Sequence, residues 1–373
     1  MKLFSNSPPA KLSMNSCLSS PPAPLQMERG DSLLKSFLTN SILCFFKTSK
    51  SFNLKSQRFF KRAPLSFWRG VGGEVLIFIL SLLFLTSCET IINPDLEQTD
   101  PLLVVDAWLT NQPKEQIIKL TETQPYFDNT TPPPVSSATI LLKNETNGRV
   151  FIFSEEASTG LYKWIPSSVL DSIGKSGDEF LLSVIVGMDE FTSSSKLGRA
   201  PTIDSISFTY EKPSGFFPEH YLGEFWATDN PGTGDTYWIK AWKNDTLLLK
   251  PSEINIAYDA GFTEGGNIDG VAFIPPIRQA ISPFEFDDNG NFISPYAFGD
   301  SVYVEIHSIN KQAFNFLFQV TIQTDRPGGF AELFAAPFSN VSTNIVNTNP
   351  NGKKAVGFFN VGVVRGKGRK LVE

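Results

Sequence analysis

The chain has 373 residues, a formal net charge of −6 and 13% aromatic residues. Its 32 basic and 38 acidic residues leave no basic surplus to neutralise phosphates, which argues against nucleic-acid binding. Its three cysteines are too few for the disulfide framework of a small secreted domain.

Residues 1–70 show no sustained period of either two or 3.6 residues. They contain proline-rich and serine-rich pieces, scattered phenylalanine and lysine, and two of the cysteines, Cys17 and Cys44. A signal peptide begins close to its own apolar region, yet here a long extension precedes that region. We therefore expect residues 1–70 to be a non-native extension of the reading frame, with translation starting near Val71 or Val75, or to be disordered.

An apolar run from Val75 to Leu85 is followed directly by Thr86, Ser87 and Cys88. The run has the length of the apolar core of a signal peptide and is too short to span a bilayer. Residues 85–88 are similar to the cleavage site of bacterial lipoproteins, in which the cysteine is acylated and becomes the new N-terminus. We predict a lipoprotein signal peptide over 71–87 and lipidation, such as palmitate, at Cys88. Basic residues precede the run: Arg58, Lys61, Arg62 and Arg69.

The alternative is an uncleaved signal anchor or a buried strand, in which Cys88 is only a small apolar residue. Glu74 before the run and Glu89 after it leave no stretch of about 20 apolar residues. Acyl chains need no such stretch, because each buried methylene contributes about 0.8 kcal/mol. The sequence therefore favours a lipid anchor.

Removal of residues 1–87 changes the charge of the chain. These residues carry 11 of the 32 basic and 3 of the 38 acidic residues, so residues 88–373 carry 21 basic and 35 acidic residues and a net charge of −14. Cys88 is then the only cysteine, which excludes an internal disulfide and a cysteine metal site. Residues 88–100 have no period, and Pro94 interrupts them, so we expect a tether of about 35–40 Å when extended.

From Pro101 onward the residues alternate with a period of two, as in strands. Asn147-Gly148 predicts a tight hairpin turn, and Pro132 to Pro134 predict a loop. Short strands without helices between them favour an immunoglobulin-like β-sandwich over 101–200. The predicted strands cover 102–109, 116–120, 138–143, 150–153 and 180–186.

A second β-rich domain is predicted over 201–373, so the fold class as a whole is mainly β. A turn at 243–245 joins two of its strands, and one amphipathic helix is expected over 311–323, capped by Ser308 or Asn310. The basic run 365–370 is expected to be a solvated tail. The predicted strands cover 202–210, 237–242, 246–249, 301–306 and 355–364.

Several segments together carry a resemblance to a known family. The predicted cleavage site at 85–88, which we call the lipobox, and the tether are followed by an opening strand over 103–113, the stretch 132–139, and the late segments 337–345 and 357–359. Over residues 88–364 the chain resembles the Bacteroidota outer-membrane lipoproteins of the DUF4249 type, a domain of unknown function. The resemblance implies an outer-membrane lipoprotein, commonly encoded beside a TonB-dependent receptor. It supplies no catalytic residues and no cofactor.

The sequence favours a non-enzymatic protein. Its only histidines are His220 and His307, and neither a His-Glu-x-x-His motif nor a Gly-x-Ser-x-Gly elbow is present. We interpret His307 as a strand residue and His220 as a loop residue. A glycosidase-type carboxylate pair is the remaining enzymatic alternative, but no spacing selects two of the acidic residues.

Residues 285–291 resemble the opening of a calcium loop, with oxygen ligands at Glu285, Asp287 and Asn289 and a glycine at the sixth position. The twelfth position, which needs an acidic residue, is Tyr296. The favoured interpretation is an acidic turn between strands, and no metal site is assigned.

Four Asp-Ser or Asp-Thr pairs are similar to the acceptor pattern for O-glycosylation in Bacteroidota. The alternative, which we favour, is that they cap turns at strand starts. The candidate acceptors are Ser172, Ser205, Thr246 and Ser301.

Two functional hypotheses follow. In the first, the protein is attached to the outer membrane by lipid and works with a TonB-dependent receptor as an accessory or binding subunit in ligand capture or uptake. In the second, it is a free-standing surface module that binds glycan or matrix through a rim of exposed aromatic residues.

Overall fold

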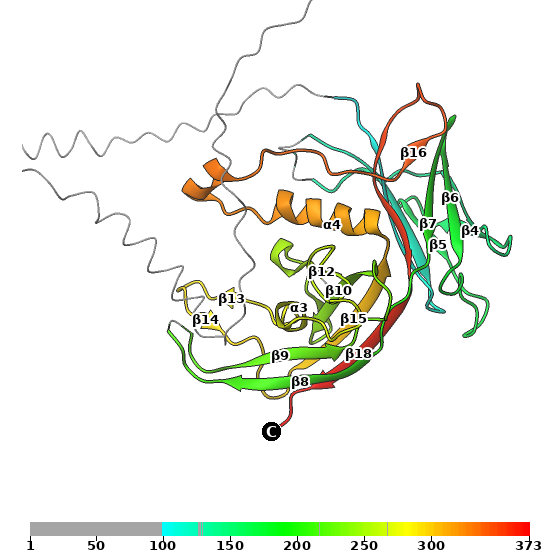
Figure 1. Cartoon of the computed structure of the whole chain (residues 1–373). Coiled ribbons are helices and arrows are strands. Elements are labelled where there is room, and N and C mark those ends of the chain that lie inside the picture. Colours follow the sequence, from blue (N-terminus) through cyan, green and yellow to red (C-terminus); the bar gives the residue numbers. More distant parts are fainter. Residues whose placement is uncertain (1–98, 126–127, 129, 216, 267) are drawn as a thin grey trace, which may run out of the picture. The chain divides into compact units, whose positions relative to one another are not determined.

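The computed structural model describes residues 99–373, apart from 126–127, 129, 216 and 267 (Figure 1). The predicted signal peptide, Leu85, Thr86, Ser87, Cys88 and most of the tether lie outside these described residues. Residues 95–373 form one compact unit. Within its described part, no helix is long and apolar enough to cross a membrane.

The first of two main sheets in the unit has nine strands, in the order β16-β7-β6-β3-β4-β5-β2-β1-β17 (Figure 1). Its strands alternate between buried and exposed side chains, as the period-two sequence predicts. Their bounds are β1 (Leu103–Thr110), β2 (Gln116–Glu122), β3 (Thr139–Asn144), β4 (Val150–Glu155), β5 (Leu161–Trp164), β6 (Glu179–Val186), β7 (Asp189–Lys196), β16 (Val346–Asn347) and β17 (Ala355–Gly362).

This sheet curls until its two ends nearly meet. The backbone N–H of Val361 on β17 donates to Ser195 Oγ on β7 at 3.1 Å, and the pairing of β4 with β5 joins the two faces. One apolar core fills the interior, with fully buried side chains such as Ile118, Ile140 and Phe359. The predicted mainly β fold is thus confirmed, and the two faces of the predicted sandwich are continuous.

A second sheet packs its own core, which includes Phe225, Tyr237 and Phe273. Its strand order is β11-β10-β15-β18, with β12 also paired to β10. Two hairpins, β8–β9 and β13–β14, and three short helices accompany it. The bounds are β8 (Ile203–Glu211), β9 (His220–Ala227), β10 (Thr236–Lys243), β11 (Thr246–Leu247), η2 (Pro251–Glu253), β12 (Asn255–Tyr258), α3 (Pro275–Gln279), β13 (Glu285–Phe286), β14 (Phe292–Ile293), β15 (Ser301–Ile309), η3 (Gly329–Phe334) and β18 (Val364–Lys370).

The predicted amphipathic helix is confirmed as α4 (Lys311–Thr324). Asn310 is its N-cap, and its side chain accepts a hydrogen bond from the Ala313 N–H at 2.8 Å. The buried face of α4 includes Phe314 and Leu317, which pack with Phe358 of β17 in a third cluster. The helix therefore covers the place where the two sheets adjoin.

Both predicted turns lie where the sequence places them, but β3 and β4 are joined by a longer loop, 145–149, than the predicted tight turn. Gly148 adopts a φ of +77° between β3 and β4, and Asn244 and Asp245 adopt φ values of 47° and 65° between β10 and β11. In the second turn both central residues, Asn244 and Asp245, have the positive φ that a two-residue hairpin requires.

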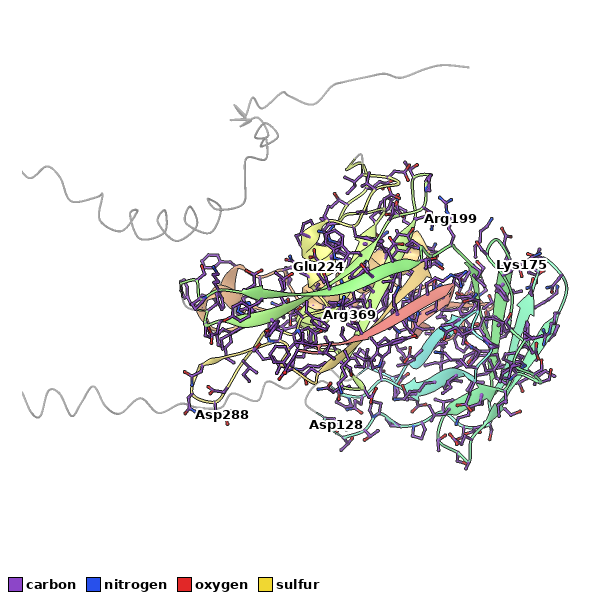
Figure 2. The ribbon with its side chains drawn as sticks, turned by 90° about the horizontal axis from the view of Figure 1, so that it is seen from below. Asp128, Lys175, Arg199, Glu224, Asp288 and Arg369 are labelled. Carbon is purple, nitrogen blue, oxygen red and sulfur yellow. The ribbon has the colours of Figure 1, made fainter. Side chains whose placement is uncertain are left out.

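The prediction of a solvated tail at 365–370 is wrong, because these residues form β18 and pair with β15. Gly366 and Gly368 leave room for the ring of Tyr303, which a Cβ at either position would approach closely. Lys367 donates to the carbonyl of Asp204 at 2.6 Å, and Arg369 donates to the carbonyl of Ile206 beside the β8–β9 ribbon (Figure 2). The basic side chains thus extend from a regular strand, and two of them donate hydrogen bonds to the backbone of β8.

The predicted loop position of His220 is also wrong, because His220 begins β9 and pairs with Glu211 of β8. The residues of β9 do not alternate cleanly between polar and apolar, so the strand has little period-two signal.

The boundary predicted near residue 200 falls between β7 and β8. The chain later returns to the first sheet, where β16 pairs with β7 and β17 pairs with β1. The last part of the predicted second domain therefore completes the first sheet. The assignment of two successive domains stays a prediction.

We predict that Gly357→Ala strongly destabilises the fold. Gly357 has a φ of +94°, and a Cβ there would lie 2.1 Å from the carbonyl oxygen of Val105 on β1. The left-handed φ and the backbone clash together should cost about 2–5 kcal/mol of unfolding free energy in a urea titration.

The matched control is Gly177→Ala, because Gly177 has a φ of +95° with nothing within 4 Å of the added Cβ. It should lose only the conformational part, about 1–2 kcal/mol. Equal losses for the two variants would show that close approach of β1 and β17 is not the constraint.

Candidate functional site

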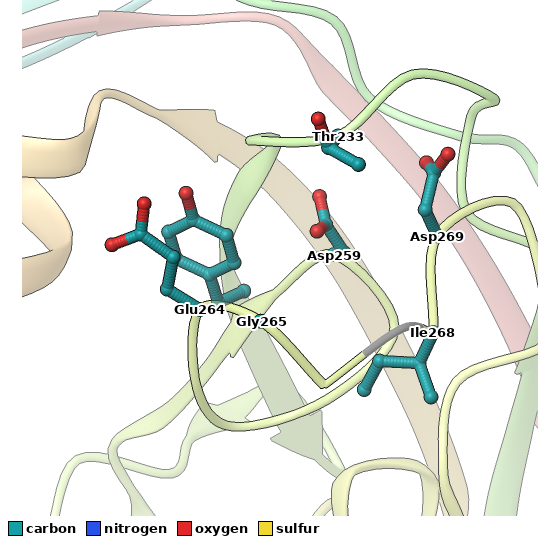
Figure 3. Close-up of a pocket in the computed structure, with 7 residues that line it drawn as sticks. Thr233, Asp259, Glu264, Gly265, Ile268 and Asp269 are labelled. Atoms are coloured by element: carbon teal, nitrogen blue, oxygen red, sulfur yellow. The ribbon is translucent and has the colours of Figure 1, made fainter.

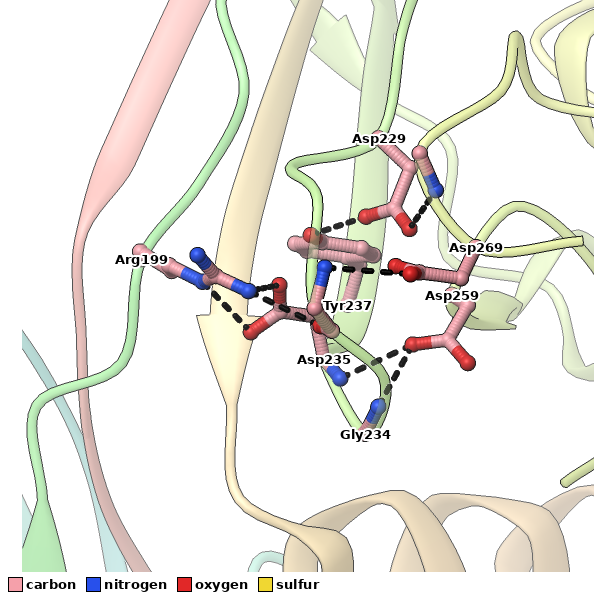
Figure 4. A network of polar contacts seen from close by, with 9 residues as sticks. Arg199, Asp229, Gly234, Asp235, Tyr237, Asp259 and Asp269 are labelled. Atoms are coloured by element: carbon pink, nitrogen blue, oxygen red, sulfur yellow. Dashed lines mark hydrogen bonds and ion pairs between the residues drawn. The ribbon is translucent and has the colours of Figure 1, made fainter.

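Four aspartates gather where β9 leads into β10 and where β12 ends: Asp229, Asp235, Asp259 and Asp269 (Figure 4). They stand in turn-forming segments rich in glycine and proline, residues 229–235 and 259–270. Asp229 and Asp259 are only 1% and 7% exposed. The folded chain therefore concentrates negative charge in a largely buried place.

Backbone N–H groups offset part of this charge. Asp259 accepts hydrogen bonds from the N–H groups of Gly234 at 2.8 Å and Asp235 at 3.0 Å through one oxygen. Asp269 accepts from the Gly232 N–H at 3.1 Å. The carboxylates thereby tie the two turns together (Figure 4).

Asp229 anchors the inner side of the cluster. One of its oxygens accepts from the Tyr237 hydroxyl at 2.5 Å, and the other accepts from the Gly270 N–H at 3.3 Å. Tyr237 is fully buried, so its hydroxyl has to find its partner inside the protein.

Arg199 supplies the cation of the cluster. Its guanidinium lies 2.8 Å from a carboxylate oxygen of Asp235 and also donates to the carbonyl of Gly232 at 2.8 Å. Burial raises the pKa of both Asp235 and Asp229 above the ordinary aspartate value, although hydrogen bonds from Arg199 and Tyr237 oppose the shift.

A pocket of about 300 Å³ opens beside the cluster (Figure 3). Asp259 and Asp269 line it together with Glu264, which is 2.6 Å from the ammonium of Lys311 on α4. The remaining lining residues are Thr233, Tyr258, Gly265 and Ile268.

The oxygens of three aspartates converge enough to hold a metal. One carboxylate oxygen each of Asp229, Asp259 and Asp269 lie within 4.8 Å of one another, and one oxygen of Asp269 is buried without a hydrogen-bond partner. Carboxylate oxygens are the ligands of hard cations such as calcium and magnesium. The hydrogen bonds that Asp259 and Asp269 accept from backbone N–H groups also hold the two turns together, so the cluster has a structural role as well.

No sequence motif marks this cluster as a site. Asp229, Asp259 and Asp269 stand far apart in the chain without metal-ligand spacing, and each reads as an ordinary turn residue. The proximity of glycine to each aspartate is the only sequence hint that backbone N–H groups would be accessible to them.

Two of the three calcium candidates, Glu285 and Asp287, have other partners in the structure. Glu285 forms an ion pair with Lys250, whereas Asp287 accepts from the N–H groups of Asn289 at 2.9 Å and Asn291 at 2.8 Å. These bonds close the turn between β13 and β14. The geometry accords with the acidic-turn interpretation.

The four candidate glycosylation acceptors lie at different places. Ser205 is exposed on β8 and Thr246 is exposed on β11, whereas Ser172 and Ser301 are half-buried. Asp300, before Ser301, accepts from the Ala297 N–H at 2.9 Å, as expected for a turn cap. Glycosylation at these positions stays a prediction.

His307 lies on β15, as the sequence predicts, and it is buried. Its Nε2 is 2.7 Å from a carboxylate oxygen of Glu305 on the same strand face. Burial lowers the pKa of His307 and lowers the pKa of Lys240 on neighbouring β10 to about 8. The ammonium of Lys240 lies 3.8 Å from the ring centroid of Trp238.

Comparison with models of known protein families gives a match. A family model described as "Domain of unknown function (DUF4249)" matches residues 89–367, which include every strand of both sheets except the end of β18. A search of curated proteins finds no match.

We predict a distinctive pH dependence for Asp229→Asn. Because the pKa of Asp229 is raised in the folded state, its ionisation destabilises the fold as pH rises through and above the unfolded value of 3.8. The asparagine variant avoids this cost. Its melting temperature relative to wild type should therefore be highest near pH 7 and should fall as pH approaches about 4.5.

Asp171→Asn is the control, because the pKa of Asp171 is lowered to about 2 by hydrogen bonds from Ser167 and by Arg149. The stability from this group is lost only as pH falls below about 3.8, so the difference from wild type should stay constant between pH 7 and 4.5. A constant difference for Asp229→Asn as well would contradict the burial argument.

Proposed function

Because the chain belongs to the DUF4249 family, a domain of unknown function, we propose its role from its own sequence motifs and from the resemblance described above. It is a Bacteroidota lipoprotein held in the outer membrane by lipid at Cys88. It is non-enzymatic, and it acts as an accessory or binding subunit of a TonB-dependent receptor in ligand capture or uptake.

The observation that carries this proposal is the position of the lipobox. Cys88 directly precedes the family match at 89–367, and the first strand begins soon after, at Leu103. A lipid on that thiol would leave a short extended tether followed by a folded β unit. The receptor partnership rests on the resemblance described above.

The non-enzymatic part is supported by how the polar side chains are used. His307 is engaged with Glu305, and the oxygens of Asp229 and Asp259 accept hydrogen bonds from Tyr237 and from turn backbones. Within the described part of the chain, these polar groups therefore have structural roles.

A specific surface supports the second candidate, a free-standing glycan or matrix binder. Phe284, Phe286 and Phe298 are 63%, 51% and 53% exposed around the β13–β14 hairpin. Tyr210, 48% exposed, adds a hydroxyl at the end of β8. Exposed aromatic rings are the feature through which a glycan-binding module would contact its ligand, so this surface is the observation in favour of the second candidate.

We predict that Cys88→Ala releases the protein from the envelope. Wild type should fractionate with membranes and incorporate labelled palmitate, whereas the variant should do neither, because the acylated thiol is gone. Asn93→Ala, in the predicted tether, is the control and should behave as wild type. Palmitate labelling that survives Cys88→Ala would refute the proposal.

Co-purification distinguishes the two candidates. Mild detergent extraction should yield a stable complex with a TonB-dependent receptor if the protein is an accessory subunit. A glycan array probed with residues 89–373 should then stay blank. Sugar binding without a receptor complex would favour the free-standing module.

A further inference from the structure

The segment Arg326–Phe338 follows α4 and contains η3, at the end of the unit away from the nine-stranded sheet (Figure 1). Its apolar side chains point outward: Phe330, Leu333 and Phe334 are 78%, 75% and 79% exposed. Its charged side chains turn inward, because those of Arg326 and Glu332 are only 14% and 33% exposed. Loop 326–338 therefore exposes its apolar side chains and partly buries its charged ones, which is the reverse of an ordinary solvated loop.

Arg326 holds the loop in this form. Its guanidinium pairs with the carboxylate of Glu332 and donates to the carbonyl of Ala336 at 2.8 Å. It also lies 4.0 Å from the ring centroid of Phe338. The charges are therefore neutralised inside the loop, and the arrangement exists before any partner arrives.

Side chains of α4 fix both ends of the returning chain. Gln323 accepts from the Ser339 N–H at 3.0 Å, and Gln319 accepts from the Ser342 N–H at 2.8 Å. On the same helix Phe318 and Ile322 are 53% and 39% exposed. Within the loop the rings of Phe330 and Phe334 are in contact, with centroids 5.7 Å apart, and exposed apolar surface of this kind marks an interaction site.

We propose that loop 326–338 inserts into the interfacial region of a zwitterionic lipid bilayer. This inference rests on the proposed function, because a lipid at Cys88 and a tether of about 35–40 Å would confine the folded unit near the membrane surface. Residues 327–338 contain one charged residue, Glu332, and it is already paired. Shallow insertion therefore leaves no unpaired charge in the loop.

The charges select the type of bilayer. Residues 88–373 carry a net charge of −14, so anionic headgroups would repel the unit, whereas zwitterionic headgroups would not. The exposed side chains of the loop are phenylalanine and leucine, which lack the polar groups that a protein interface interleaves with its apolar contacts. The bilayer is thus the occupant that this chemistry fits best.

The test uses the single cysteine of residues 88–373. This chain contains the whole compact unit 95–373, and its thiol can be coupled to a maleimide lipid in phosphatidylcholine vesicles, independently of natural acylation. Phe334→Trp places a fluorophore in the loop, and Ile152→Trp places one at a 65% exposed position on β4 as the control. Lipids brominated on their acyl chains then report which site enters the bilayer.

The expected result is bromine quenching of the added fluorescence that is several-fold stronger for Phe334→Trp than for Ile152→Trp. Adding Phe330→Ser and Leu333→Ser to Phe334→Trp should reduce the quenching to the control level, because two inserted apolar side chains are lost. Urea unfolding should show that all variants fold, since the substituted side chains are exposed.

Equal quenching at the two positions would overturn the inference. Quenching that is absent in lipid alone, with the fluorescence of Phe334→Trp shifting to the blue only when a receptor is added, would also overturn it and assign the loop to a protein partner. Neither result depends on whether Cys88 is acylated in cells. Failure of acylation refutes the proposed function alone, and failure of insertion refutes this inference alone.

Discussion

The parallel pairing of β1 with β17 is the constraint on which the rest of this structure depends. It runs from Leu103 opposite Ala355 to Thr110 opposite Gly362. Val105 can approach only because residue 357 is a glycine. After one further residue the same chain continues as β18 in the second sheet. One continuous segment is therefore a member of both sheets, and it fixes the surface that α4 covers.

Local pattern predicts much of this fold. Alternation identifies strands such as β2 and β6, turn-forming residues identify the positions of the turns at Gly148 and Asn244, and Asn310 identifies the start of α4. These features depend on neighbours in sequence. The pairing of β17 with β1 does not, because it joins residues about 250 positions apart, and nothing in either strand specifies the other. The strand at 364–370 was missed because charge in a sequence indicates exposure and not the absence of backbone pairing.

The same distinction explains the candidate sites. A lipobox is a local motif, so Cys88 can be proposed from sequence alone. The aspartate cluster arises from two turns that the fold brings together, and its buried carboxylates are tolerated because backbone N–H groups and Arg199 face them. In sequence, loop 326–338 is likewise only a short apolar stretch. The structure shows that its phenylalanine and leucine side chains face solvent while the side chain of Arg326 is largely buried. The sequence thus shows which residue types make up the aspartate cluster and loop 326–338, whereas only the folded structure shows which of their side chains are buried.

The late position of β17 also has a consequence for biogenesis. The chain emerges from N- to C-terminus, so β1 exists long before its parallel neighbour has been synthesised. Until then β1 presents an unpaired edge, and unpaired edges are prone to intermolecular association. Pairing over such long separations in sequence is also slow. Productive folding is therefore expected only after the whole chain has been synthesised.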